Sequence, residues 1–128
     1  MGERKRIGLA VVGSLAVCAA MATAATPAAA GTAAASCYAS SGNLYCDNAP
    51  AAIYAAPRYS RPNGNPERVV DRLLTTHSYF KCYVTGQQHG GGNNVWYHTY
   101  GDQTGAWGYV AAANVYTSVD PYPGVSRC

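Results

Sequence analysis

The chain has 128 residues, of which 48% are hydrophobic, 11% aromatic and 12% charged, and its net charge is +3. Three of the nine basic residues stand together at Arg4–Arg6, and residues 31–128 retain six basic and five acidic side chains, a net charge of +1. No basic stripe remains in residues 31–128, so we expect no nucleic-acid partner.

The N-terminal segment has the order of a secretory signal peptide. The basic start precedes an apolar run at residues 7–22, and small residues, mostly Ala, fill residues 23–35. This order predicts a signal peptide with cleavage after Ala30 or Ala35, and Pro27 favours Ala30 because it would end the apolar helix. The apolar run is shorter than the roughly 20 residues of a membrane-spanning helix. We therefore expect a secreted protein, extracellular or associated with the cell wall, with no membrane segment after cleavage.

The cysteines predict two disulfides. Cys18 lies within the predicted signal peptide, where a lipoprotein interpretation would acylate it, although Val17 is bulky where a small residue is expected. The other four are an even number in a short chain bound for an oxidising compartment: Cys37, Cys46, Cys82 and Cys128. We favour Cys37–Cys46, since the turn residues 40–43 would bring its ends together, and this leaves Cys82–Cys128. No C-x-x-C pair is present, so we expect no metal and no cofactor.

After residue 36 the sequence alternates β-type runs with turn clusters, without a convincing amphipathic helix. The predicted strands are residues 51–54, 69–74, 78–85, 95–100, 106–110 and 115–117. The run at 69–74 could by its pattern alone also be a helical turn. In the run at 78–85, alternation places Phe80, Cys82 and Val84 on one face. Residues 58–65 and the glycine-rich residues 86–94 are predicted loops. Strands at roughly ten-residue spacing predict an all-β fold, a small barrel or sandwich.

Four of these segments follow a family pattern. An apolar strand ends in a Pro-containing loop at residues 53–57, and a Val-Val-x-x-Leu segment follows at 69–73. A Trp-led strand comes at residues 96–99 and a Gly-x-x-Gly-Tyr-Val hairpin at 105–110. In this order they resemble the bacterial Src-homology-3-like (SH3-like) domains of secreted and cell-wall proteins, in the style of actinobacteria.

The resemblance implies a division of the chain and a ligand. A signal peptide at 1–30 would precede a disulfide-closed segment at 31–52, an SH3-like β-barrel at 53–118 and a tail at 119–128 that a disulfide ties down. The usual ligand of the resembled family is cell-wall peptidoglycan, bound through its stem or cross-bridge peptides.

The sequence provides no convincing catalytic constellation. His89 and the three glycines after it match the oxyanion loop of some esterases, but no Gly-x-Ser-x-Gly elbow accompanies them. His77, His89 and His98 have no i, i+4 spacing, and the acidic residues are scattered singly. We therefore expect the histidines on the surface or on a strand face, and a protein that is not an enzyme.

Aromatic side chains are the main resource for binding: eleven Tyr, two Trp and one Phe. Phe80 and Trp96 are predicted core residues. Four others alternate with polar or small residues, could serve as core or as groove, and are our predicted ligand contacts: Tyr97, Tyr100, Trp107 and Tyr109. Such rings can stack on a ligand while their polar tips donate hydrogen bonds, which suits extended peptides or sugars.

The sequence thus predicts a monomeric, non-enzymatic binding module for a cell-wall peptide or glycan. The alternative is a small secreted inhibitor that contacts an extracellular protein, with residues 58–66 and 88–94 as its contact loops. Sedimentation with purified peptidoglycan would separate the two, because an inhibitor has no reason to pellet.

Overall fold

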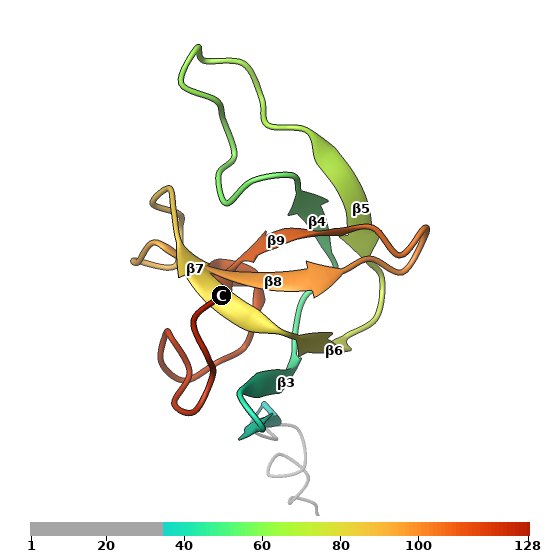
Figure 1. Ribbon diagram of the computed structural model, residues 1–128, viewed down its shortest axis with the longest axis vertical. Coiled ribbons are helices and arrows are strands. Elements are labelled where there is room, and N and C mark those ends of the chain that lie inside the picture. The colour runs from blue at the N-terminus through green and yellow to red at the C-terminus, as the bar shows by residue number, and fades with distance from the viewer. Residues whose placement is uncertain (1–34) are drawn as a thin grey trace, which may run out of the picture. The chain divides into compact units, whose positions relative to one another are not determined.

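Eight short strands carry the regular structure of the computed structural model, which describes residues 35–128 (Figure 1). This part of the chain is all-β; its one helical element is the 3-10 turn η2 (Ala112–Asn114). No helix in the same residues is long and apolar enough to cross a membrane. The predicted signal peptide, with Cys18, lies outside the described residues.

The smaller sheet contains three antiparallel strands in the order β2 (Cys37–Ser40), β3 (Asn43–Asp47) and β6 (His77–Phe80). The hairpin β2–β3 turns through Ser41 and Gly42, whose φ angles of 53° and 83° are both positive. A two-residue hairpin of the I′ type needs positive φ at both central positions, which explains the glycine. The predicted turn at residues 40–43 is therefore this hairpin.

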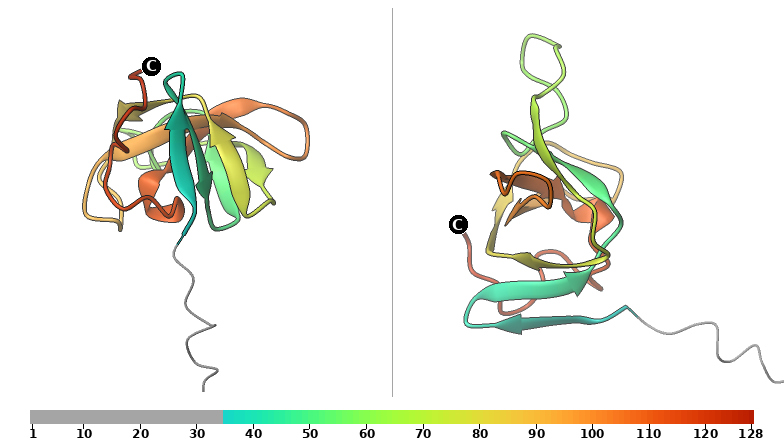
Figure 2. Two further views of the ribbon diagram at one scale, coloured as in Figure 1. Left: turned by 90° about the horizontal axis from the view of Figure 1, so that it is seen from below. Right: turned by 90° about the vertical axis from the view of Figure 1, so that its right-hand side faces the viewer.

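The larger sheet contains five strands in the order β5 (Val69–Leu73), β4 (Ala51–Tyr54), β9 (Trp107–Ala111), β8 (Val95–Tyr100) and β7 (Cys82–Thr85). All its strand pairs are antiparallel. The β2–β3 hairpin lies to one side of this sheet (Figure 2). The smaller sheet thus adds a second layer to the larger one.

The closed barrel predicted for residues 53–118 is not present. Within residues 35–128, β5 and β7 are the edges of the five-stranded sheet and do not pair with each other. The predicted boundary after residue 52 falls within β4, which begins at Ala51, and β3 on its N-terminal side pairs with β6. Residues 35–128 form one compact unit. The last predicted strand, at 115–117, is reduced to an isolated bridge between Val115 and Asn48.

The strand predicted at residues 78–85 is divided between the two sheets at Lys81. Phe80 ends β6 and packs on the buried ring of Tyr97, with the ring centroids 5.8 Å apart. In β7 it is Tyr83 that lies opposite Tyr97, while Cys82 lies opposite His98 on the other face. The side-chain alternation therefore shifts by one at Lys81, and the prediction that Phe80 and Cys82 share a face is wrong.

The core lies between the two sheets. It is built from the inward side chains of alternate strand positions, as a half-buried strand requires. Its fully buried large residues include Leu44, Ile53, Leu73, Phe80, Tyr97 and Val110. Trp96 is also fully buried, although on the other face of β8, beneath the rings of Tyr59 and His89. The predictions that Phe80 and Trp96 are buried side chains are therefore confirmed.

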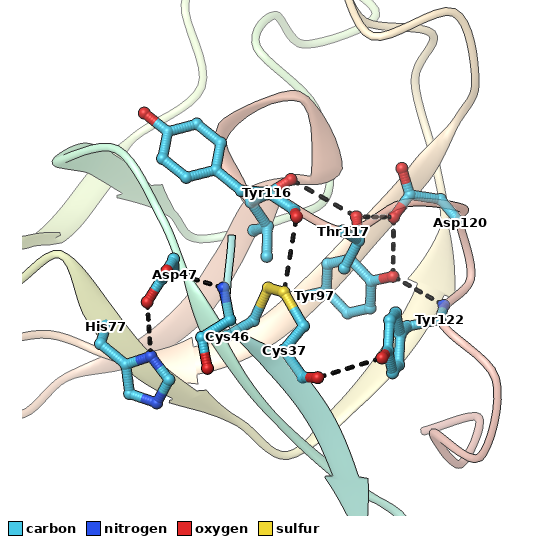
Figure 3. The surroundings of a disulfide bond; sticks show 11 residues. Cys37, Cys46, Asp47, His77, Tyr97, Tyr116, Thr117, Asp120 and Tyr122 are labelled. Atoms are coloured by element: carbon cyan, nitrogen blue, oxygen red, sulfur yellow. Dashed lines mark hydrogen bonds and ion pairs between the residues drawn. A yellow bond between two sulfur atoms is a disulfide. The ribbon is translucent and has the colours of Figure 1, made fainter. Parts of the chain in front are cut away.

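Two disulfides fasten the ends of this unit, in the pairing favoured from the sequence. Cys37 and Cys46 lie directly opposite each other in the β2–β3 hairpin and are bonded, as Figure 3 shows. Cys82 at the start of β7 is bonded to Cys128 at the C-terminus. The C-terminal segment also covers the edge of β7, because Tyr83 N–H donates to Ser126 O (3.0 Å) and Cys128 N–H donates to Tyr83 O (2.9 Å).

Candidate functional site

Seven aromatic rings form a chain that crosses both sheets, and we call it the aromatic track. In order along the surface they are Tyr38, Tyr45, Tyr79, Tyr100, Trp107, His98 and Tyr109. The centroids of neighbouring rings are 4.8 to 6.0 Å apart, within the usual range for interacting aromatic pairs. A chain of rings this close presents one extended aromatic surface.

Strand register explains how residues distant in sequence meet in the track. In the small sheet, Tyr45 lies directly opposite both Tyr38 and Tyr79. In the large sheet, Trp107 and Tyr109 of β9 lie opposite Tyr100 and His98 of β8, respectively. Directly opposite residues share a face of an antiparallel sheet, as do residues two apart in one strand. The contact of Tyr79 with Tyr100, at 6.0 Å, joins the two groups of rings.

The track is accessible along its length. Tyr38, Tyr100 and Trp107 are 52%, 42% and 47% exposed, and the other four rings are half-buried. The ring planes of Tyr38 and Tyr45 are only 13° apart, so these rings stack. The ammonium of Lys81 lies 5.9 Å from the Trp107 ring centroid. Exposed rings of this kind can stack against a flat or weakly polar ligand.

Of the four predicted ligand contacts, Tyr97 is the one that does not lie in the aromatic track. Its side chain is fully buried, because residue 97 faces the core between the outward residues 96 and 98 of β8. The phenol donates to Asp120 Oδ1 (2.8 Å) and accepts from Tyr122 N–H (2.9 Å), as Figure 3 shows. Burial raises the pKa of Tyr97, and the hydrogen bond to the Asp120 carboxylate raises it further. Tyr97 is a core residue.

The other three predicted contacts, Tyr100, Trp107 and Tyr109, lie together in the track. Sequence reasoning missed its remaining members, Tyr38, Tyr45, Tyr79 and His98. Part of the signal was present in the sequence: Tyr38 follows Cys37 and Tyr45 precedes Cys46, so the disulfide that pairs the cysteines also pairs the tyrosines. No comparable feature of the sequence indicates that β3 pairs with β6.

Asp71 holds the turn that presents Tyr100 and Trp107. Its carboxylate accepts hydrogen bonds of 2.7 to 3.2 Å from four backbone N–H groups and one hydroxyl: Arg72 N, Gln103 N, Thr104 N, Ala106 N and Thr104 Oγ1. Burial raises the pKa of Asp71, but these hydrogen bonds outweigh it and the net pKa is well below the usual range. A Cβ at Gly101 would collide with this carboxyl group. Asp71 therefore acts as a structural anchor.

A pocket of about 360 Å³ opens beside the middle of the track. Its lining comprises Tyr45, Leu73, Thr75, His77, Ser78, Tyr79, Thr99, Tyr100 and Asp102. Asp102 Oδ2 accepts from Leu74 N–H (2.7 Å), Thr75 N–H (3.1 Å) and Thr75 Oγ1 (3.1 Å). The hydrogen bond from Leu74 lowers the pKa of Asp102 most, so its carboxylate is ionised at neutral pH. The His77 ring is held by Asp47, with Nδ1 2.7 Å from Oδ1 (Figure 3).

The glycine-rich loop is fastened by its histidine, contrary to the expectation of a surface or strand-face side chain. His89 is only 9% exposed, and its Nε2 lies 2.8 Å from Val95 O. Its Nδ1 accepts a hydrogen bond from Gly91 N–H (3.1 Å). In the string that resembles an esterase oxyanion loop, the histidine thus has a structural function.

One group in residues 35–128 has the spacing of metal ligands: Cys82, Cys128 and His98, whose ligand atoms lie within 4.8 Å of one another. The two sulfurs are bonded to each other, and a metal needs thiolates. The group therefore does not offer a metal site in the oxidised protein.

Comparison with known proteins leaves the chain without an assigned relative. It matches no protein-family profile, no curated protein and no solved structure. The chemistry of the track and its pocket is therefore the evidence for function.

Proposed function

We propose that this protein is a secreted, non-enzymatic module that binds cell-wall peptidoglycan, or another extracellular peptide or glycan, along the aromatic track. The observation that carries the proposal is the seven-ring surface with ring spacings of 4.8 to 6.0 Å. Extended chains of sugars or peptides can stack on such a surface at several points. Two disulfides support an oxidising destination outside the cell.

We also propose that the larger sheet is an SH3-like unit that has opened. The four segments that carry the resemblance occupy or border β5, β4, β9 and β8, which are consecutive neighbours in that sheet. This continuity supports the proposal, because segments of one ancestral unit should remain together in the fold. The β2–β3 hairpin would then be an addition to the unit.

Two of the carboxylates, Asp71 and Asp120, support a binding function over a catalytic one. Asp71 and Asp120 each accept several hydrogen bonds from groups of the protein, and these bonds fix the turn before Trp107 and the C-terminal segment. A general acid or base needs a carboxyl group that can exchange a proton with a substrate. The carboxylates of Asp71 and Asp120 are instead occupied by hydrogen bonds that stabilise the fold.

Sedimentation with purified peptidoglycan tests the proposal. The parent protein should pellet, and Tyr100→Ala and Trp107→Ala should each weaken binding by about 2 kcal/mol, a factor of roughly 30, if these rings are hot spots. Tyr116→Ala is the matched control, because Tyr116 is 52% exposed and lies outside the track.

Circular dichroism must show that each variant is folded. Folded Tyr100→Ala and Trp107→Ala proteins that pellet as well as the parent would contradict the proposal. Equal loss in the Tyr116→Ala protein would show that the binding has no preference for the track.

A second candidate, an inhibitor of an extracellular enzyme, is favoured by the long connection from β4 to β5, which projects from the sheets (Figure 1). This loop is internally braced: Arg61 N–H donates to Asn65 O (2.7 Å) and Arg58 Nε to Glu67 Oε1 (2.6 Å). A braced projecting loop loses little entropy when it enters a cleft. An inhibitor would remain in the supernatant of the sedimentation experiment.

A further inference from the structure

We propose that the pocket beside the aromatic track binds a primary ammonium group. The inference deepens the proposed function, and it rests on that function only for the source of the amine. The three observations behind it are the inclination of the pocket's aromatic walls, a carboxylate with a free oxygen, and the distribution of charge around the opening.

The aromatic walls are Tyr45, Tyr79 and Tyr100. Their planes are inclined to one another, by 56° between Tyr45 and Tyr79 and by 44° between Tyr79 and Tyr100, so neighbouring walls do not stack on each other. Rings that line a pocket without stacking on one another can offer their faces to a ligand. The faces of aromatic rings carry negative quadrupole charge, which attracts a cation within about 6 Å.

Asp102 supplies the full negative charge. Its Oδ2 is held by the backbone N–H groups of Leu74 and Thr75 and by the Thr75 hydroxyl. Oδ1 of Asp102 accepts no hydrogen bond from residues 35–128, since all three bonds to this carboxylate end on Oδ2. One oxygen thus fixes the carboxylate in place while the other remains available to accept a hydrogen bond from a ligand. An ammonium group donates three such bonds.

The other lining residues favour a positively charged ligand that donates hydrogen bonds. No Lys or Arg is among its lining residues, and the one titratable base, His77, lies 2.7 Å from Asp47 Oδ1. The hydroxyls of Thr75 and Ser78 lie 3.1 Å apart at the wall and can also accept. A carboxylate ligand would be repelled by Asp102, whereas a primary ammonium satisfies both the carboxylate and the ring faces.

Two components of a wall could present this group, an amino-acid side chain or an amino sugar, and matched probes distinguish them. The first pair is Nα-acetyl-lysine amide and its uncharged counterpart Nα-acetyl-norleucine amide. The second pair is glucosamine and N-acetylglucosamine. Titrations followed by NMR should give a Kd on the order of 1 mM for at least one charged probe, and a Kd at least about tenfold weaker for its neutral counterpart. Equal binding of the charged and neutral members of both pairs would overturn the proposal.

Variants locate the binding in the pocket. Asp102→Asn keeps an oxygen for the backbone donors but removes the charge, and Tyr100→Leu keeps an apolar side chain but removes the ring. Each should weaken the charged probe by about tenfold. Tyr116→Leu, which changes an exposed tyrosine outside the pocket, should bind as the parent does. If Asp102→Asn does not fold, the folded Tyr100→Leu protein decides alone, and unchanged affinity in it overturns the proposal.

The two proposals fail in different ways. If the protein pellets with peptidoglycan but binds neither charged probe, the wall-binding function is supported and the ammonium site is contradicted. If the protein binds a charged probe at the pocket but does not pellet, the ammonium site is supported and peptidoglycan is contradicted as the source of the amine.

Discussion

Gly108 shows how closely the sheet is packed beneath the track. A Cβ at this position would collide with the Tyr54 carbonyl oxygen and would lie 2.7 Å from Ile53 Cγ2 and 3.0 Å from Val70 Cγ2. We expect Gly108→Val to reduce the free energy of unfolding by about 1–3 kcal/mol, measured by thermal denaturation. Gly90→Val is the control, because a Cβ at Gly90 meets nothing within 4 Å. An unchanged melting temperature for Gly108→Val would mean that β4 and β9 are not packed in this way.

His98 makes the track sensitive to pH. Burial lowers the pKa of His98 below its usual 6.5, and the positive charge of Lys81 lowers it further. The folded protein therefore binds this proton less well than the unfolded chain does. The stability that the neutral ring contributes is present above pH 6.5 and is lost as the pH falls through the folded pKa.

An NMR titration of His98 checks this prediction. Its midpoint should lie below 6.5 and should rise in Lys81→Met, which removes the nearby charge. Arg127→Met is the control, because it also removes a positive charge, but one that lies over the Tyr83 ring. A parent midpoint at or above 6.5 would contradict the expectation.

Single residues also show what sequence could and could not predict about the site. Alternation along β8 gives Trp96, His98 and Tyr100 the same face, yet Trp96 is fully buried and Tyr100 is exposed. The cause is tertiary: the rings of Tyr59 and His89 lie 5.1 and 5.8 Å from the Trp96 ring, so two loops cover it. Nothing local in the sequence says where a loop will fold back.

At the level of elements, strands with clear boundaries were predictable and strand partnerships were not. Residues 51–54 and 95–100 are strands as expected, and the run at 69–74 contains β5 and no helical turn. The change of sheet at Lys81 had no signal, because apolar alternation continues through residues 78–85. The shift arises from pairing, since β6 joins β3 while β7 joins β8.

The two disulfides should differ in their contribution to stability. They join residues 9 and 46 positions apart, so the loops that they close in the unfolded chain differ greatly in length. By chain entropy the double change Cys37→Ala with Cys46→Ala should cost about 3 kcal/mol, and Cys82→Ala with Cys128→Ala about 4 kcal/mol. Urea unfolding of the two variants, each with its other disulfide intact by mass spectrometry, measures the order. A larger loss from the β2–β3 disulfide would contradict it.

For the whole unit, the all-β class followed from the sequence and the barrel did not. Turn clusters at regular spacing predicted short strands throughout, and residues 35–128 are built this way. A closed barrel would need the two edge strands of the larger sheet, β5 and β7, to be joined by pairing, directly or through β6. Instead β6 pairs with β3, and register matches such as Leu44 with Phe80 bury apolar side chains there. The same pairing brings Tyr45 beside Tyr79 and so extends the track onto the second sheet.

The low charge of the whole molecule leads to a last prediction, about salt. Residues 31–128 carry a net charge of +1, and six of the seven rings of the track are tyrosines or tryptophan, which are uncharged at neutral pH. Raising the salt from about 0.1 M to about 1 M shortens the screening length from roughly 10 Å to roughly 3 Å. Binding to peptidoglycan should therefore stay within about twofold over this range in sedimentation, because stacking carries most of the affinity. An ammonium held in the partly buried pocket is also screened less than a surface ion pair. A tenfold or greater loss of binding to peptidoglycan would show that exposed charges, and not the aromatic rings, supply most of the affinity.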